Sequence, residues 1–317
     1  YYYTPRLSSL TGQTSLTALN EESGTETLSF LQRNRLISSS TYIESNLSYQ
    51  KEIDDKNEVS GLLVFTINDR LSTLADGDLG ASEAQQLQKS LAYRNMGVSG
   101  RFTYARSQKY FAEFSFGYNG SERFAKAERW GFFPSLALGW MVSDEKFFDS
   151  IDDVVTKLKI KGSYGLVGND QIGGPNDRFF YLSQVDLNSG GYTTGENFSN
   201  FQSGVSIQRY ANDQITWETG KKMNIGFELG LFKKVDLEVD LFREDRENIL
   251  SNRILPSSIG LQAGVRANIG EARSDGVDGT VVFSDDFADG NGWMQLRGNF
   301  TYAKNKITRL FCYPMVI

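Results

Sequence analysis

Hydrophobic and polar residues alternate with a period of two along most of the chain. In residues 158–169, Leu158 and Ile160 occupy alternate positions, and Lys159 and Lys161 lie between and after them. Because successive side chains of a β-strand point to opposite faces, this pattern predicts a strand with one apolar and one charged face. Similar segments begin near Ile43, Val59, Met96, Tyr110, Phe132, Met223, Val235, Val277 and Met294. The sequence therefore predicts about ten strands, mostly of about 9 to 12 residues.

The lengths of the strands and of their connections favour a membrane barrel. Strands of soluble proteins usually have about 5 to 6 residues, whereas a tilted strand needs about 9 to 11 to cross a bilayer. Short connections are predicted at 52–57, 106–109, 143–156, 232–234 and 284–292, and long ones at about 67–94, 119–131, 168–218 and 245–265. They alternate, as the short periplasmic turns and long extracellular loops of outer-membrane barrels do. The predicted fold is all-β, an antiparallel up-and-down transmembrane β-barrel.

In such a barrel the apolar face of each strand meets lipid and the charged face meets a wet lumen. Among sheets, only a closed one satisfies every backbone N–H and C=O group in hydrocarbon. Aromatic residues bracket two of the strands, Tyr110 and Tyr118 in one and Phe132 and Trp140 in the other, as expected at the headgroup level. Aromatic residues alone fit the core of a soluble β-protein equally well, so the prediction depends on strand length and loop asymmetry.

Composition removes several classes of function. The chain has 317 residues, a net charge of -6 and no histidine. An acidic balance does not suit nucleic acid, and the absence of histidine removes the commonest general base and neutral metal ligand. The chain has no run of about 18 apolar residues, so no transmembrane helix is predicted. Residues 165–174 lack the Lys-Ser/Thr pair of a phosphate-binding loop, and residues 285–292 lack the closing glutamate of a calcium loop. We therefore expect no cofactor, no metal and no catalytic site.

One long segment and three shorter ones resemble a known family. They are "YRNMGVSGRFTYARSQKYFAEFSFGYNGSERFAKAERWGFFPSLALGWMVSDEKFF", residues 93–148, followed by "LKIKGSYGLVGNDQIG", "ITWETGKKMNIGFELGLF" and "VDLEVDLFREDRENIL". They resemble the barrel of SusC/RagA-type TonB-dependent outer-membrane transporters, over about residues 42–307. The resemblance implies a large barrel plugged by an N-terminal domain and energised through TonB. It also implies a SusD-like surface lipoprotein that captures oligosaccharides or peptides.

The chain departs from the family's pattern in extent. We find no counterpart of the plug, the TonB box or the leading domain, and about ten strands are fewer than half of a barrel of about 22. Alone they would leave two unpaired edges in hydrocarbon. We therefore expect residues 1–317 to be a partial barrel domain of a larger polypeptide. Residues 310–317 lack the alternation seen upstream.

Two sets of charged residues are candidates for function on the lumen side. They are Lys157, Lys159 and Lys161 in one strand and Asp236, Glu238 and Asp240 in another. A third strand, around Met223, lies between them in the predicted order, so the sets are separated by roughly 10 Å near the periplasmic end. We predict that they face the plug and hold it through exchangeable charged hydrogen bonds. A hydrated wall whose charges only keep the lumen wet is an equal alternative.

Aromatic residues gather in the predicted long loops. The candidates are Trp130, Phe179, Phe180, Tyr181, Tyr192 and Trp217, with Phe198, Phe201 and Tyr210 beside them. Aromatic walls with a few polar groups suit sugar faces or peptide side chains. For any single ring, packing between loops or contact with the lipoprotein cap is favoured over ligand binding.

Three functions remain open at this point. Active nutrient import in the outer membrane is favoured, a passive porin is the alternative, and a hydrolase on a β-scaffold is the least favoured. No pair of carboxylates is placed at a defined distance across a cleft, as glycoside hydrolysis requires. Loops vary freely on one scaffold, so the nutrient cannot be identified from sequence.

Overall fold

The structure, a computed structural model, describes residues 2–8, 11–19, 38–72, 91–173, 178–287 and 292–309. Its main sheet contains β3 (Ser38–Asp54), β4 (Asn57–Ser72), β5 (Tyr93–Arg106), β6 (Tyr110–Ser121), β7 (Trp130–Met141), β8 (Val155–Asn169), β11 (Glu218–Leu231), β12 (Val235–Arg253), β13 (Val265–Phe287) and β14 (Gly292–Arg309). Two further hairpins pair β1 (Tyr2–Leu7) with β2 (Thr14–Leu19) and β9 (Gln184–Thr194) with β10 (Asn200–Arg209). The atypical tail, residues 310–317, lies outside the described residues.

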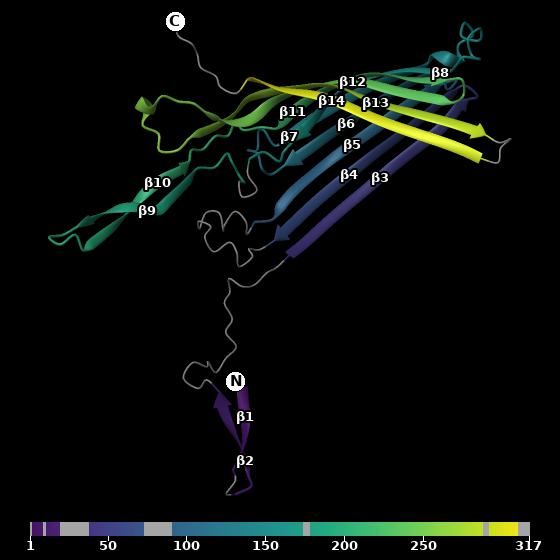
Figure 1. The fold of residues 1–317 in the computed structure, drawn as a ribbon. Helices are drawn as coiled ribbons and strands as arrows, with labels where there is room; N and C mark the ends of the chain where they lie inside the picture. The colour runs from purple at the N-terminus through teal and green to yellow at the C-terminus, as the bar shows by residue number, and fades with distance from the viewer. Residues whose placement is uncertain are drawn as a thin grey trace.

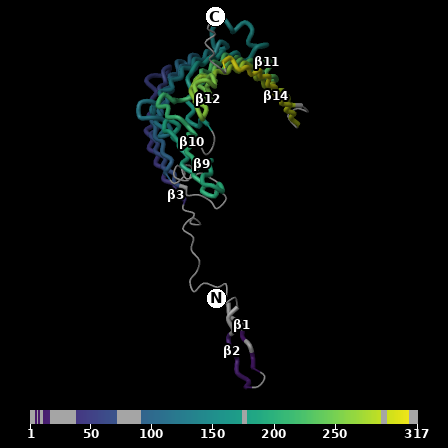
Figure 2. Tube along the Cα trace, turned by 90° about the vertical axis from the view of Figure 1, so that its left-hand side faces the viewer, coloured from purple at the N-terminus to yellow at the C-terminus, as the bar shows by residue number. Residues whose placement is uncertain are grey.

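The ten strands of the main sheet are antiparallel and follow chain order, except that the β9–β10 hairpin is inserted between β8 and β11. The sheet is strongly curved and forms an open arc (Figures 1 and 2). The predicted all-β, up-and-down architecture is therefore confirmed. Within the described residues, no helix is long and apolar enough to cross a membrane.

Among the connections that the structure describes, the short turns lie at one end of the main sheet and the long loops at the other (Figure 1). Two of the turns are tight hairpins with positive φ at both central residues, Ser107 and Gln108 in one and Phe232 and Lys233 in the other. This backbone suits the right-handed twist of the flanking strands, although neither turn has the usual asparagine or glycine. Another short connection, between β7 and β8, contains the short 3-10 helix η3 (Val142–Asp144). The predicted alternation of connection lengths is confirmed.

The strands are longer than predicted, and the prediction of about 9 to 12 residues was wrong. They have 12 to 23 residues in the main sheet. In β12, the alternation of apolar and polar residues ends near Leu241, but the ladder continues to Arg253, and residues 243–247 are charged on both faces. Cross-strand ion pairs such as Arg243–Asp275, at 2.5 Å, occupy this extension. Hydrophobic alternation therefore marks only the part of each strand that has an apolar side.

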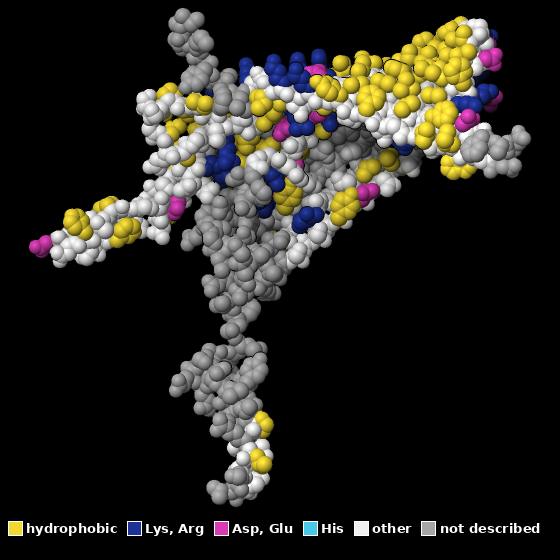
Figure 3. Space-filling model, in the orientation of Figure 1, with side chains coloured by type: hydrophobic (Ala, Val, Ile, Leu, Met, Phe, Trp, Pro, Cys, Tyr) yellow, Lys and Arg dark blue, Asp and Glu magenta, His cyan; other side chains and the backbone are white. Residues whose placement is uncertain are grey.

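The apolar face of the sheet is exposed rather than covered by a second layer. Leu136 and Leu138 expose 51% and 58% of their surface, and aliphatic and aromatic side chains cover the outer face towards the short turns (Figure 3). The buried hydrophobic residues among those described all lie in connections: Phe124, Val142, Phe148, Ile172, Phe180, Ile215 and Trp217. A soluble sandwich would bury its strand residues instead. The apolar face is thus available to lipid.

Aromatic residues border the apolar outer face at two levels. Trp130 and Trp140 lie at opposite ends of β7, on the same face, where they pair with Gly120 and Tyr110 of β6. Ten residues span roughly 33 Å along a strand, or about 25 Å across the membrane at the usual tilt of outer-membrane strands. This matches the height of the apolar band between the aromatic girdles of outer-membrane barrels.

Candidate functional site

The inner face of β8, β11 and β12 brings the two predicted charged sets together. Lys161 Nζ lies 2.5 Å from Glu238 Oε1 and 3.1 Å from Asp240 Oδ2. The sequence predicted a separation of roughly 10 Å between backbones, and the long lysine side chain spans it. The cluster lies near the short-turn end of the sheet, as predicted.

A glycine in the middle strand makes this contact possible. Gly226 of β11 pairs with Lys161 on one side and with Asp240 on the other. A Cβ atom on Gly226 would lie 2.2 Å from Asp240 Oδ1 and 2.9 Å from Lys161 Cε. Any side chain here would therefore push the lysine and the aspartate apart. The missing side chain provides the space through which Lys161 crosses β11.

Glu228 completes the cluster and was missed by the sequence prediction. Its carboxylate lies 2.6 Å from Lys157 Nζ, 3.8 Å from Lys159 Nζ and 3.9 Å from Lys161 Nζ. Alternation places Glu228 on the polar face of its strand, but it does not reveal which residue of β8 lies opposite. That residue is Lys159. The strand register, which only the structure provides, identifies Glu228 as the acceptor shared by the three lysines.

The charges of this inner-wall cluster do not fully balance. Three lysines face four carboxylates, and Asp236 makes no ion pair with any described residue. The paired side chains expose between 21% and 49% of their surface, so water competes for each pair. Exposed ion pairs contribute about 0 to 1 kcal/mol each. The cluster is therefore suited to exchanging partners rather than to locking the wall or to acid–base catalysis.

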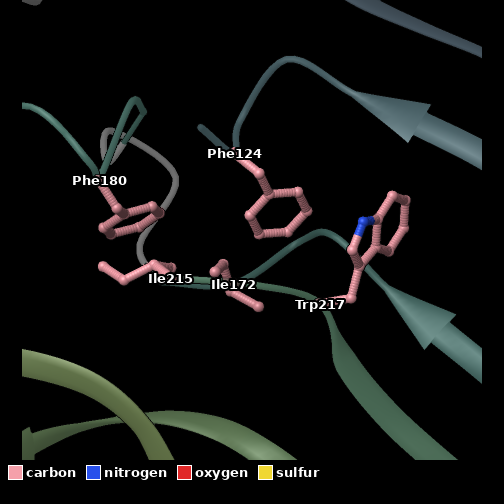
Figure 4. Close-up of a cluster of buried hydrophobic side chains, with 5 residues drawn as sticks. All are labelled: Phe124, Ile172, Phe180, Ile215 and Trp217. Atoms are coloured by element: carbon pink, nitrogen blue, oxygen red, sulfur yellow. The ribbon is translucent and has the colours of Figure 1, made fainter. Parts of the chain in front are cut away.

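Two of the predicted loop aromatics are buried. Phe180 and Trp217 pack with Phe124, Ile172 and Ile215, and expose 1% and 8% of their surface (Figure 4). The Phe124 and Trp217 rings are 5.2 Å apart, and the Trp217 indole N–H donates to the backbone carbonyl of Arg129 at 3.3 Å. These two residues hold loops together, in agreement with the packing alternative.

Trp130 belongs to a different surface from the other candidates. It begins β7 on the apolar outer face and stacks on Tyr118 with 4.9 Å between ring centroids. This is an aromatic pair at the border of the lipid-facing band. Phe179 and Tyr181 are half-buried and meet edge to face at 6.2 Å, whereas Tyr192 on β9 is 64% exposed. The six aromatic candidates thus do not form a single site.

An arginine joins three of the connections near the long-loop end. The Arg178 guanidinium donates to the backbone carbonyls of Leu91 and Ala92 at 2.7 and 2.8 Å, and it pairs with the Glu122 carboxylate. It also lies over the ring of Tyr93, 5.6 Å from the centroid. No local pattern predicts this arrangement, because its members are far apart along the chain.

Glu145, in the connection between β7 and β8, accepts hydrogen bonds whose strength should depend on pH. The Tyr110 hydroxyl and the Trp140 indole N–H donate to its carboxylate at 2.5 and 3.3 Å, and these hydrogen bonds lower the pKa of Glu145. A lowered pKa stabilises the folded chain above the ordinary glutamate pKa, and this contribution disappears as the pH falls through the lowered value.

We therefore expect the intact protein to lose thermal stability on acidification through the range in which Glu145 is protonated. Glu145→Gln should reduce this pH dependence, and differential scanning calorimetry between pH 7 and pH 3 measures the difference. Asp149→Asn, in the same connection, is the matched control. Equal pH dependence in wild type and Glu145→Gln would contradict the assignment.

Comparison with known proteins identifies the family. Residues 2–311 match the family described as TonB dependent receptor-like, beta-barrel. TonB-dependent receptor P39 of Formosa agariphila is 27% identical over 285 residues, covering 84% of this chain and 26% of the relative. TonB-dependent receptor SusC of Bacteroides thetaiotaomicron is 29% identical over 232 residues, covering 70% of this chain and 22% of the relative. The chain thus spans about a quarter of the length of these relatives.

A solved structure has the same fold. The RagAB peptide importer in its closed-closed state superposes with a TM-score of 0.66 at 22% identity, over 87% of this chain and 31% of that one. The superposition agrees with the predicted antiparallel barrel wall, and the matched relatives include SusC, as the resemblance implied. The family consists of outer-membrane transporters rather than enzymes. The chain belongs to the TonB-dependent receptor family, and its ten-stranded sheet is a segment of an outer-membrane β-barrel of the SusC/RagA type.

Proposed function

We propose that this chain is part of the barrel wall of a nutrient importer energised through TonB. The observation that carries the proposal is the division of the main sheet between an apolar outer face and an inner face that carries the charged cluster, in a chain of this family. Residues 1–317 are then a partial barrel domain, and the plug and the TonB-binding segment belong to the rest of the receptor. The experiment is uptake by cells that carry the intact receptor, with and without a functional TonB.

Uptake that requires TonB supports the proposal. Uptake that continues at the same rate without TonB would favour a passive porin, which needs no energy source.

We further propose a SusD-like lipoprotein as partner and an oligosaccharide or peptide as ligand. One matched relative is SusC, and the superposed structure is that of a peptide importer. In this chain the exposed aromatic residues of the β9–β10 hairpin offer an accessible contact surface: Tyr192, Phe198 and Phe201 expose 64%, 71% and 59% of their surface. Phe179 and Tyr181 are the half-buried members of the same loop region. Flat rings with polar neighbours suit both classes of ligand.

The inner-wall cluster is proposed to contact the plug through its three lysines. Reversing Lys157, Lys159 and Lys161 to glutamate should release the plug and raise its susceptibility to protease by about tenfold, because charged hydrogen bonds to it are lost. Limited proteolysis of the intact receptor measures this. Replacement of the same lysines by arginine keeps the charges and serves as the control.

A charge swap distinguishes lysines that contact the plug from lysines that only pair with carboxylates within the wall. The lysine reversals are combined with reversal of the three partners, Glu228, Glu238 and Asp240, to lysine, which restores pairing within the wall. If the lysines contact the plug, the swapped wall should still release it. Normal protection of the plug in the swapped receptor would show that the cluster only pairs with itself, as the hydrated-wall alternative holds.

A further inference from the structure

A charged patch lies on the outer face of the sheet, where the strand register aligns charges from four strands. One row contains Met223, Arg243, Asp275 and Lys304, and the next contains Lys221, Asp245, Arg273 and Lys306. Residues directly opposite each other in antiparallel strands share a face. Along each strand, the residues of these two rows lie two positions apart and alternate with residues of the inner face. They therefore follow the apolar outward residues of the same strand. The two rows, which we call the outer charged patch, therefore point away from the lumen.

Cations exceed anions in the outer charged patch. Arg243 pairs with Asp275 at 2.5 Å, and Arg273 pairs with Asp245 at 2.6 Å. Lys221 pairs with Glu247 in the row beyond, at 2.6 Å. Lys304 and Lys306 make no ion pair with any described residue, and both are exposed. Two positive charges are thus left over on neighbouring outward positions of β14.

The patch adjoins the lipid-facing band directly. The row below it contains only apolar and aromatic side chains: Ile225, Leu241, Val277 and Tyr302. On each strand, outward residues change from apolar to charged at the side of the sheet nearer the long loops. Figure 3 shows Lys and Arg side chains along the outer face beside the hydrophobic band, where β12 and β14 lie. The patch is therefore at the level of the lipid headgroups on the extracellular side.

We propose that the outer charged patch binds the phosphate-bearing headgroup of an anionic lipid in the outer leaflet. The ammonium groups of Lys304 and Lys306 supply the positive charge, and Arg243 and Arg273 offer guanidinium groups that exchange a carboxylate for a phosphate. Tyr302 lies one outward position before Lys304 and contacts the start of the acyl region. The site rests on the outer-membrane location of the family and is independent of what the receptor imports.

Retention of lipid by the intact receptor tests the proposal. The receptor is purified in detergent, mixed with lipid A or phosphatidylcholine, and bound lipid is counted by native mass spectrometry. Lys304→Gln with Lys306→Gln should lower retention of lipid A by at least about tenfold, since each basic residue near a headgroup contributes about 1 kcal/mol. Phosphatidylcholine retention should not change. Lys157→Gln with Lys159→Gln, which removes the same charge from the inner face, is the matched control.

Two results would overturn the proposal. Equal retention of lipid A by the Lys304/Lys306 variant and the inner-face control would show that the patch does not bind headgroups. Displacement of lipid A by millimolar inorganic phosphate would show that phosphate alone, and not a lipid, is the ligand. Nutrient uptake by the Lys304/Lys306 variant is expected to stay unchanged, because neither lysine belongs to the inner-wall cluster, so failure of lipid binding is distinguishable from failure of the import function.

Discussion

Replacing Leu136 by arginine is expected to destabilise the receptor in its bilayer by about 2 to 4 kcal/mol, the cost of an arginine on the lipid face near the midplane. Leu136 lies between Trp130 and Trp140 on β7 and is 51% exposed on the outer face. Its partners across the ladder, Phe114 and Tyr164, are also outward. The new guanidinium would have only hydrocarbon and aromatic rings around it. Equilibrium unfolding of the intact receptor from lipid vesicles measures the change.

The next residue along the strand provides the control. Ala137 points to the inner face, opposite Glu113 and Ser163. Arginine there gains a carboxylate neighbour and water, so Ala137→Arg is expected to change stability by less than about 1 kcal/mol. Similar losses at both positions would mean that both faces of β7 are enclosed. This result would contradict the membrane orientation of the whole sheet.

The second large effect is expected at Trp217. Truncation to alanine removes a ring that packs against Phe124 and Phe133, at 5.2 and 5.3 Å between ring centroids. Loss of a buried tryptophan costs about 3 to 5 kcal/mol. The loss falls on the small core that joins the loops rather than on the strand ladder. We therefore expect faster hydrogen exchange at residues 122–129 and 210–217, with little change in the strands.

An exposed aromatic residue of the same end is the matched control. Tyr192→Ala, on the β9–β10 hairpin, should leave hydrogen exchange of the loops unchanged, because its ring is 64% exposed. If Trp217→Ala left exchange unchanged and instead weakened binding of the nutrient, the packing role would be wrong and the ligand role correct.

The positions and faces of the strands could be predicted from sequence because the alternation is local. In residues 158–166, the position of each apolar residue shows which face of the strand it occupies, and no information about another strand is needed. The β9–β10 hairpin was missed because its alternation is short: Val205 and Ile207 alternate with polar residues, but much of both strands consists of Gly, Ser, Thr, Asn and Gln. The part of β12 after Phe242 was missed because charged residues follow one another there without alternation. There, cross-strand charges replace hydrophobic contact.

The candidate site was less predictable because it depends on register and burial. Lys157, Lys159 and Lys161 were recognised from one strand, but Glu228 became part of the cluster only when β8 and β11 were aligned. Residue type likewise does not distinguish a buried aromatic such as Phe180 from an exposed one such as Tyr192. Both cases need contacts between segments far apart in the chain, which a local pattern does not contain.

The space left by Gly226 gives the inner wall a form of redundancy. Lys161 lies within 4 Å of Glu238, Asp240 and Glu228, so loss of any one acid leaves the lysine two others. Substitution of Glu238 or Asp240 alone is therefore expected to be nearly neutral, whereas loss of Glu228 would also leave Lys157 and Lys159 without their acceptor. The charge of this wall can therefore change at Glu238 or Asp240, one residue at a time, while Lys161 keeps a partner.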